Sequence, residues 1–101
     1  MTALQKRIEA IEKVGAGALA DQTLQKFIHL HLQKYEQHLA EVQRELAPFE
    51  RQYGMSSEDC HRRFVAGELG DTADLMEWMS LYDTVLLYQD RIATLRAAAP
   101  L

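Results

Sequence analysis

The stretch that decides the fold is FIHLHLQKYEQHLAEVQRELAPFERQY, residues 27–53. Apolar side chains recur along it at alternating spacings of four and three residues, which places them on one face of an α-helix. This apolar seam consists of Ile28, Leu32, Tyr35, Leu39, Val42, Leu46, Phe49 and Tyr53. A helix cannot cover so long an apolar face by itself, so the seam must pack against partner helices.

Length and composition define the class of protein. The 101 residues suffice for one small domain, residues 1–101, with a limited apolar core. A formal net charge of −4 disfavours binding to the phosphates of nucleic acids. No stretch reaches the length of a membrane span, the N-terminus lacks the apolar run of a signal peptide, and the single cysteine fits a reducing compartment. We expect a cytoplasmic protein that binds neither nucleic acid nor membrane.

The N-terminal region predicts a short helix followed by a break. Thr2 and Gln5 have the spacing of a capping box, in which two side chains satisfy the free N–H groups of a helix start. The apolar pattern behind them predicts a helix over residues 2–14. Two closely spaced glycines then interrupt the pattern, because glycine costs about 1 kcal/mol relative to alanine inside a helix. We therefore expect a break over residues 15–20.

The long helix is predicted over residues 21–53. Asp21 stands at an N-cap position, and Gly54 supplies the left-handed residue that commonly ends a helix. Pro48 lies inside the pattern, where it removes one backbone donor. Since the apolar spacing persists beyond the proline, we expect a kink just before it rather than an end. Termination at Ala47 is the alternative.

Two further helices are predicted in the C-terminal half. Ser56 begins a short helix over residues 56–66, which a glycine ends. Asp71 or Thr72 then begins the last helix, over residues 71–97. This helix carries two neighbouring apolar stripes, one of Trp78, Leu81, Val85, Tyr88, Ile92 and Leu95, and one of Leu75, Met79, Tyr82 and Leu86.

The two longest helices predict an antiparallel hairpin. At about 1.5 Å per residue they span roughly 50 Å and 40 Å, so they can pair along most of their length. One partner helix covers only one stripe of the last helix. We therefore predict an all-α fold, a long antiparallel hairpin with a short helix at the turn and a short N-terminal helix, that dimerises into a helical bundle. The predicted oligomer seam comprises Ile28, Leu32, Tyr35, Leu39, Val42 and Leu46, with an intramolecular core as the alternative.

The segment YGMSSEDCHRRFVAGELGDTADLMEWMSLYD, residues 53–83, is the most distinctive motif. It resembles a group of small bacterial proteins that share the pattern YGMSSEE, then RF, AGELGD and EW. The resemblance implies an antitoxin-like protein, which binds and masks a small cytosolic toxin. The chain departs from the shared pattern at Cys60–His61, where two aromatic residues are usual, and at Leu75–Met76, in place of a phenylalanine pair.

The matched residues form a candidate partner-binding surface. Acidic side chains recur at every third position from Glu68 to Glu77 and complement the basic surface of an RNA-binding toxin, with Trp78 as an anchor. The candidate surface comprises Phe64, Glu68, Leu69, Asp71, Asp74, Glu77 and Trp78. The alternative is structural: the acids cap the last helix, and the indole fills the hairpin core.

Patterns for catalysis or metal binding are weak. The serines lack a triad-like context, and no phosphate-binding glycine loop is present. The histidines on the long helix lie either too far apart or on nearly opposite sides of the helix, so they cannot bind one metal ion together. We therefore predict no enzyme, no cofactor and no metal site within one chain. A self-assembling scaffold protein is the alternative function, and a metal shared by His31 and His38 of two subunits is a weaker one.

Overall fold

The computed structural model describes residues 1–99; Pro100 and Leu101, the end of the predicted domain, lie outside the described residues. The described chain forms four α-helices and no strand, which confirms the predicted all-α class. The helices are α1 (Ala3–Lys13), α2 (Gly17–Tyr53), α3 (Ser57–Val65) and α4 (Ala73–Ala98).

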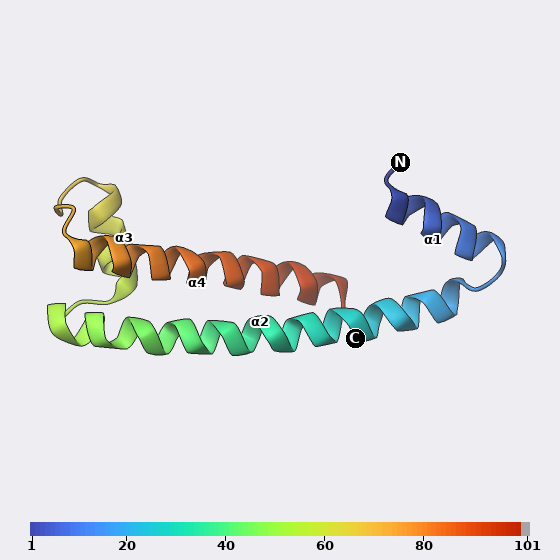
Figure 1. Ribbon diagram of the computed structural model, residues 1–101, viewed down its shortest axis with the longest axis horizontal. Helices are drawn as coiled ribbons and strands as arrows, with labels where there is room; N and C mark the ends of the chain where they lie inside the picture. The colour runs from blue at the N-terminus through green and yellow to red at the C-terminus, as the bar shows by residue number, and fades with distance from the viewer. Residues whose placement is uncertain (100–101) are drawn as a thin grey trace.

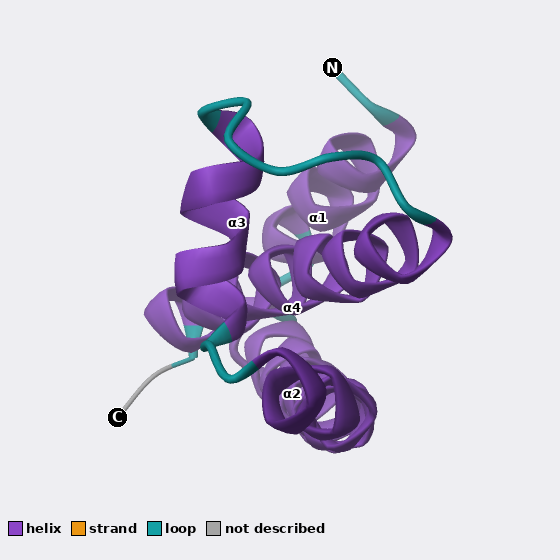
Figure 2. Cartoon of the chain, turned by 90° about the vertical axis from the view of Figure 1, so that its left-hand side faces the viewer, coloured by secondary structure: helices purple, strands orange, loops and turns teal. Residues whose placement is uncertain are grey.

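The predicted hairpin of α2 and α4 dominates the molecule. Figure 1 shows α4 running back along α2, while α1 folds back over the opposite end of α2. Figure 2 shows α3 lying across the hairpin at the end where the chain turns. The radius of gyration is 19.6 Å, against about 13 Å for a compact domain of this length. The subunit is therefore elongated, with dimensions of 59 × 25 × 20 Å.

The seam of α2 packs against α4 of the same chain. Leu32 and Leu46 are buried, and Leu39 and Val42 are half-buried, the last two packed against the main core cluster. Leu32, Leu39, Val42 and Leu46 of the predicted oligomer seam therefore contribute to the intramolecular core, the alternative that the sequence left open. Their assignment to a surface between subunits is wrong, because α4 already occupies that face. For Ile28 and Tyr35, which are half-buried, the assignment stays a prediction.

The second apolar stripe of α4 is largely covered by α3. Met79 is buried in the cluster that contains Cys60 of α3, and Leu75 and Tyr82 pack against the same cluster. Only Leu86, which is 39% exposed, remains uncovered in this stripe. The expectation that a second subunit is needed to cover the stripe is therefore wrong for most of it, because the short helix takes that place.

Several predicted helix ends are confirmed. The side chains and backbones of Thr2 and Gln5 form the reciprocal capping box of α1. Ser56 Oγ accepts a hydrogen bond from the backbone N–H of Asp59 at the start of α3. Gly54 ends α2 with a φ of 65°, a left-handed conformation that glycine adopts without steric cost.

The start of α2 differs from the prediction. The break spans only the three residues between Lys13 and Gly17, where Gly15 turns the chain with a φ of 79°. Helix α2 therefore begins four residues before Asp21, which lies inside the helix and is not its N-cap. Gly17 enters the helix despite its low propensity because α1 packs back against this part of α2.

Helix α2 continues through Pro48 to Tyr53, so the alternative that it ends at Ala47 is wrong. A proline inside a helix costs about 3 kcal/mol. Leu46 and Phe49, on either side of it, both pack in the core, and burial of such a side chain contributes about 1.5–3 kcal/mol. The packing of the seam therefore offsets the proline. The predicted kink stays a prediction.

The N-terminal end of the molecule is thinly packed. Helix α1 contains no buried residue, and Ile8 and Ile11 are half-buried where it docks on α2. The buried residues lie from Leu32 onward. The core is thus concentrated toward the turn of the hairpin.

Candidate partner-binding site at the closed end

The closed end of the hairpin is defined here as the end of α2, helix α3, the loop over residues 66–72 and the first turns of α4. All seven residues of the candidate partner-binding surface lie within it, between Phe64 and Trp78. Figure 2 shows this loop passing over the end of the hairpin between α3 and α4. The fold therefore brings the motif residues together in one region.

A buried hydrogen-bond network joins the three helices that meet at the closed end. Trp78 Nε1 of α4 donates to Ser57 Oγ of α3 at 2.8 Å. The Ser57 hydroxyl and backbone N–H both donate to Glu50 Oε2 of α2, at 3.0 Å and 2.9 Å. Because Ser57 is only 3% exposed, these bonds replace lost contacts with water and fix the three helices relative to one another.

The indole of Trp78 belongs to the core. It is 1% exposed, and the rings of Phe49 and Tyr53 stack against it with centroid distances of 5.8 Å and 5.5 Å. The ring therefore does not project from the surface of the folded subunit. The prediction of Trp78 as a surface anchor is therefore wrong, and the structural alternative is correct for this residue.

The acids at the start of α4 have different roles. The N-cap is Thr72, whose hydroxyl accepts from the N–H of Leu75 at 3.2 Å, and not Asp71. Asp74 Oδ2 accepts a hydrogen bond of 2.7 Å from Tyr53 Oη. This hydrogen bond is the main cause that raises the pKa of Tyr53, with desolvation and the charge of Asp74 adding to it. Asp74 thus ties α4 to the end of α2.

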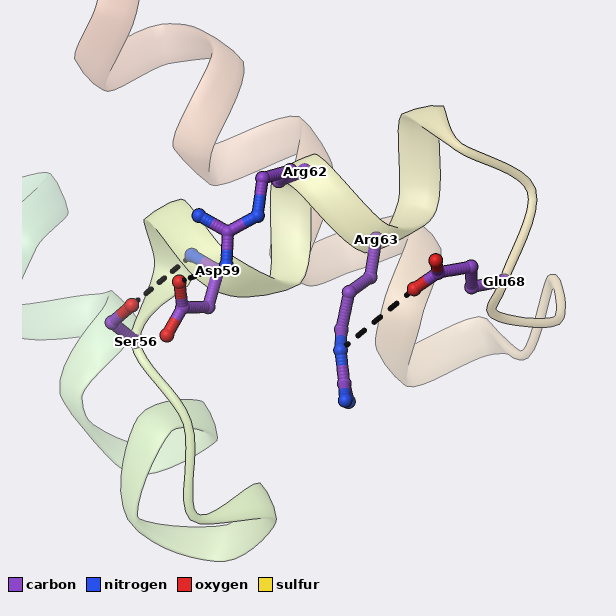
Figure 3. A network of polar contacts seen from close by, with 5 residues as sticks. All are labelled: Ser56, Asp59, Arg62, Arg63 and Glu68. Atoms are coloured by element: carbon purple, nitrogen blue, oxygen red, sulfur yellow. Dashed lines mark hydrogen bonds and ion pairs between the residues drawn. The ribbon is translucent and has the colours of Figure 1, made fainter.

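Only part of the acidic surface is neutralised by basic side chains. Figure 3 shows Glu68 facing Arg63, at 3.9 Å, whereas Arg62 pairs with Asp59 on α3. Asp71 and Glu77 are exposed, and neither side chain forms a hydrogen bond or an ion pair with any residue of the described chain. The sequence contains no lysine or arginine from residue 64 to residue 90. The loop and the start of α4 therefore present uncompensated negative charge.

A small pocket of about 180 Å³ opens beneath this loop. Its walls are mostly apolar and come from the end of α2, from α3, from the loop and from α4: Tyr53, Met55, Cys60, Leu69, Gly70, Thr72, Leu75 and Trp78. Burial raises the pKa of the Cys60 thiol, and the charge of Arg63 acts in the opposite direction. The net upward shift keeps the thiol neutral at neutral pH, so it is an apolar part of the wall.

His31 and His38, the two histidines considered for a metal shared between subunits, lie on α2 away from the closed end. His31 packs against Phe27, with ring centroids 4.4 Å apart, and His38 packs against Tyr88 at 6.0 Å. Within residues 1–99 no three His, Cys, Asp or Glu side chains come together as metal ligands. A metal shared between two subunits stays a prediction.

Comparison with protein-family models, curated proteins and solved structures found no match to this chain. The resemblance of residues 53–83 to antitoxin-like proteins therefore stays a prediction. In the described part of the chain, no helix combines the length and the apolar character that a membrane crossing requires.

The sequence patterns do not reveal Ser57, which accepts the hydrogen bond of the Trp78 indole, or Glu50, which accepts from Ser57. Glu50 resembles any other acid of a solvated helix face, and Ser57 follows the serine that caps α3. The serine pair in MSSED was the available signal, because a cap needs only one serine. The contact between these two residues can be predicted only if the angle at which α3 crosses the hairpin is known.

The network predicts a specific cost for removing one hydroxyl group. Ser57→Ala leaves the buried indole N–H of Trp78 without an acceptor, so the free energy of unfolding should fall by about 1–3 kcal/mol. Ser80→Ala is the matched control, because Ser80 is exposed and its hydroxyl makes no hydrogen bond within the described residues. Urea unfolding of both variants measures the difference. Equal stability of the two variants would show that the network contributes nothing.

Proposed function

We propose that this protein is a helical protein-binding module that masks a small basic cytosolic toxin, in the manner of an antitoxin. The observation that carries the proposal is the pair of exposed, unpaired carboxylates, Asp71 and Glu77, on the closed end, where an apolar pocket also opens. A toxin that acts on RNA needs a basic surface to bind phosphates. The acidic closed end complements such a surface, and the resemblance of the surrounding motif to antitoxin-like proteins agrees with it.

The closed end divides the candidate residues into two groups. Trp78 is buried, Asp74 accepts a hydrogen bond from Tyr53, and Phe64 packs on the core cluster. These three residues hold the helices together. Glu68, Asp71 and Glu77 are left to contact a partner, and so is Leu69, which packs on the core cluster but also lines the pocket. A rigid base with charged groups around it limits the side-chain entropy lost on binding. Complementary charge also accelerates association.

The test is co-expression with the product of the adjacent gene, followed by pull-down and by measurement of growth rescue. The unaltered protein should form a complex and restore growth. The double variant Asp71→Lys/Glu77→Lys should weaken the complex at least about tenfold, because like charges then face the basic partner. The control Glu41→Lys/Glu45→Lys makes the same change in net charge at exposed positions of α2.

Absence of a complex and of rescue with the unaltered protein would reject the proposed function. Equal weakening by both double variants would show that net charge alone matters, and would reject the closed end as the binding site. Thermal unfolding of each variant confirms that the fold is retained.

A self-assembling scaffold is the second candidate, favoured by the open end of the hairpin, defined here as residues 3–31. Large apolar side chains are exposed there: Leu4, Val14, Leu19, Leu24, Phe27 and Leu30. No residue of the open end is buried within the subunit. Exposed apolar side chains gathered in this way are typical of interaction surfaces.

Light scattering at tens of micromolar tests this candidate. If the open end mediates assembly, the unaltered protein should have the mass of a dimer, and Phe27→Ser/Leu30→Ser should be monomeric. Val65→Ser/Leu87→Ser is the control, since it replaces two exposed apolar side chains elsewhere. A monomeric unaltered protein would contradict assembly.

A further inference from the structure

We infer that the pocket at the closed end binds one apolar side chain of the partner, and that lysine or arginine residues flank that side chain in the partner's sequence. This inference rests on the proposed function and specifies what the partner presents. It follows from the size of the pocket, from the chemistry of its walls and from the charges beside it.

The pocket has the size of one large side chain. Its volume is about 180 Å³, and an apolar protein cavity of about 150 Å³ is large enough to bind benzene. A leucine or phenylalanine side chain therefore fits, whereas a helix or a second ring system does not. The pocket is accordingly a site for one residue of a longer segment.

The walls select a hydrocarbon. Trp78 donates its only N–H to Ser57 Oγ, and the Cys60 thiol is neutral and buried, so neither offers a free polar group. Leu69 and Leu75 add aliphatic surface. A polar side chain entering the pocket would give up hydrogen bonds to water and gain few in return. An apolar side chain would gain from leaving water.

One charge beside the pocket selects the flanking residues. Asp71 lies between Gly70 and Thr72, which both line the pocket. Its carboxylate is exposed and unpaired within the described chain. Glu77 lies on the opposite side of α4 from the pocket-lining Leu75 and adds only to the general negative charge of the closed end. Cations next to the apolar residue of the partner are therefore favoured, and acids are repelled.

The experiment uses the full chain and three synthetic pentapeptides as probes: Lys-Arg-Leu-Arg-Lys, Lys-Arg-Ser-Arg-Lys and Glu-Asp-Leu-Asp-Glu. Amide and indole NMR shifts of the ¹⁵N-labelled protein report where each peptide binds. The basic leucine peptide should shift the amides of Leu69, Gly70 and Thr72 and the indole of Trp78. The serine peptide should bind about tenfold more weakly, because it buries no hydrocarbon.

Each other outcome overturns the inference in a defined way. Equal binding of the leucine and serine peptides would leave charge alone as the cause. Equal binding of the acidic peptide would remove the role of the carboxylates. The same shifts appearing with rising protein concentration and no peptide would assign the pocket to a second copy of this chain. Absence of shifts for all three peptides would exclude the pocket as a binding site.

The variants described above separate this inference from the proposed function. Asp71→Lys/Glu77→Lys should weaken the basic leucine peptide severalfold, whereas Glu41→Lys/Glu45→Lys should leave it unchanged within error. If the pull-down succeeds while no peptide binds, the proposed masking function is retained and the inference that the pocket binds a side chain of the partner is rejected. If the peptide binds while the adjacent gene product does not, the pocket is retained as a binding site and the adjacent gene product is rejected as the partner.

Discussion

The buried hydrogen bonds of Ser57 are the constraint on which the closed end depends. A two-helix hairpin has no third layer, and α3 supplies one only if it crosses α2 and α4 at a defined position. Ser57 sets that position by accepting from the indole of Trp78 and donating to Glu50. A shift of α3 along the hairpin would leave buried polar atoms without partners, which costs more than the loss of an apolar contact of similar size.

Closely spaced residues at the closed end have different roles, because some hold the helices together and others are available to a partner. Trp78 is buried and Asp74 is hydrogen-bonded to Tyr53, while Asp71 and Glu77, a few positions away, are exposed without partners in the described chain. The pocket shares wall residues, Trp78 among them, with the core. A binding site built on a fixed core loses little conformational freedom when a partner arrives. The open end has no equivalent support.

The sequence predicted the helices and the hairpin because both follow from local periodicity and capping. It failed where the answer depended on three-dimensional packing. The face of α4 that carries Met79 was expected to need a second subunit, because periodicity does not show that nine residues of α3 suffice to cover it. The spacing of the acids could not show that Asp74 is bonded to Tyr53 while Asp71 has no partner within the described residues.

Hydrogen exchange of the Trp78 indole N–H tests the central claim most directly. If the bond to Ser57 fixes α3 on the hairpin, this proton should exchange about as slowly as the amides of Val85 and Leu46 in the core, because all require the same cooperative opening. Exchange as rapid as that of the exposed loop amides, while the core amides remain protected, would show that α3 detaches freely. The closed end would then not be a preformed site.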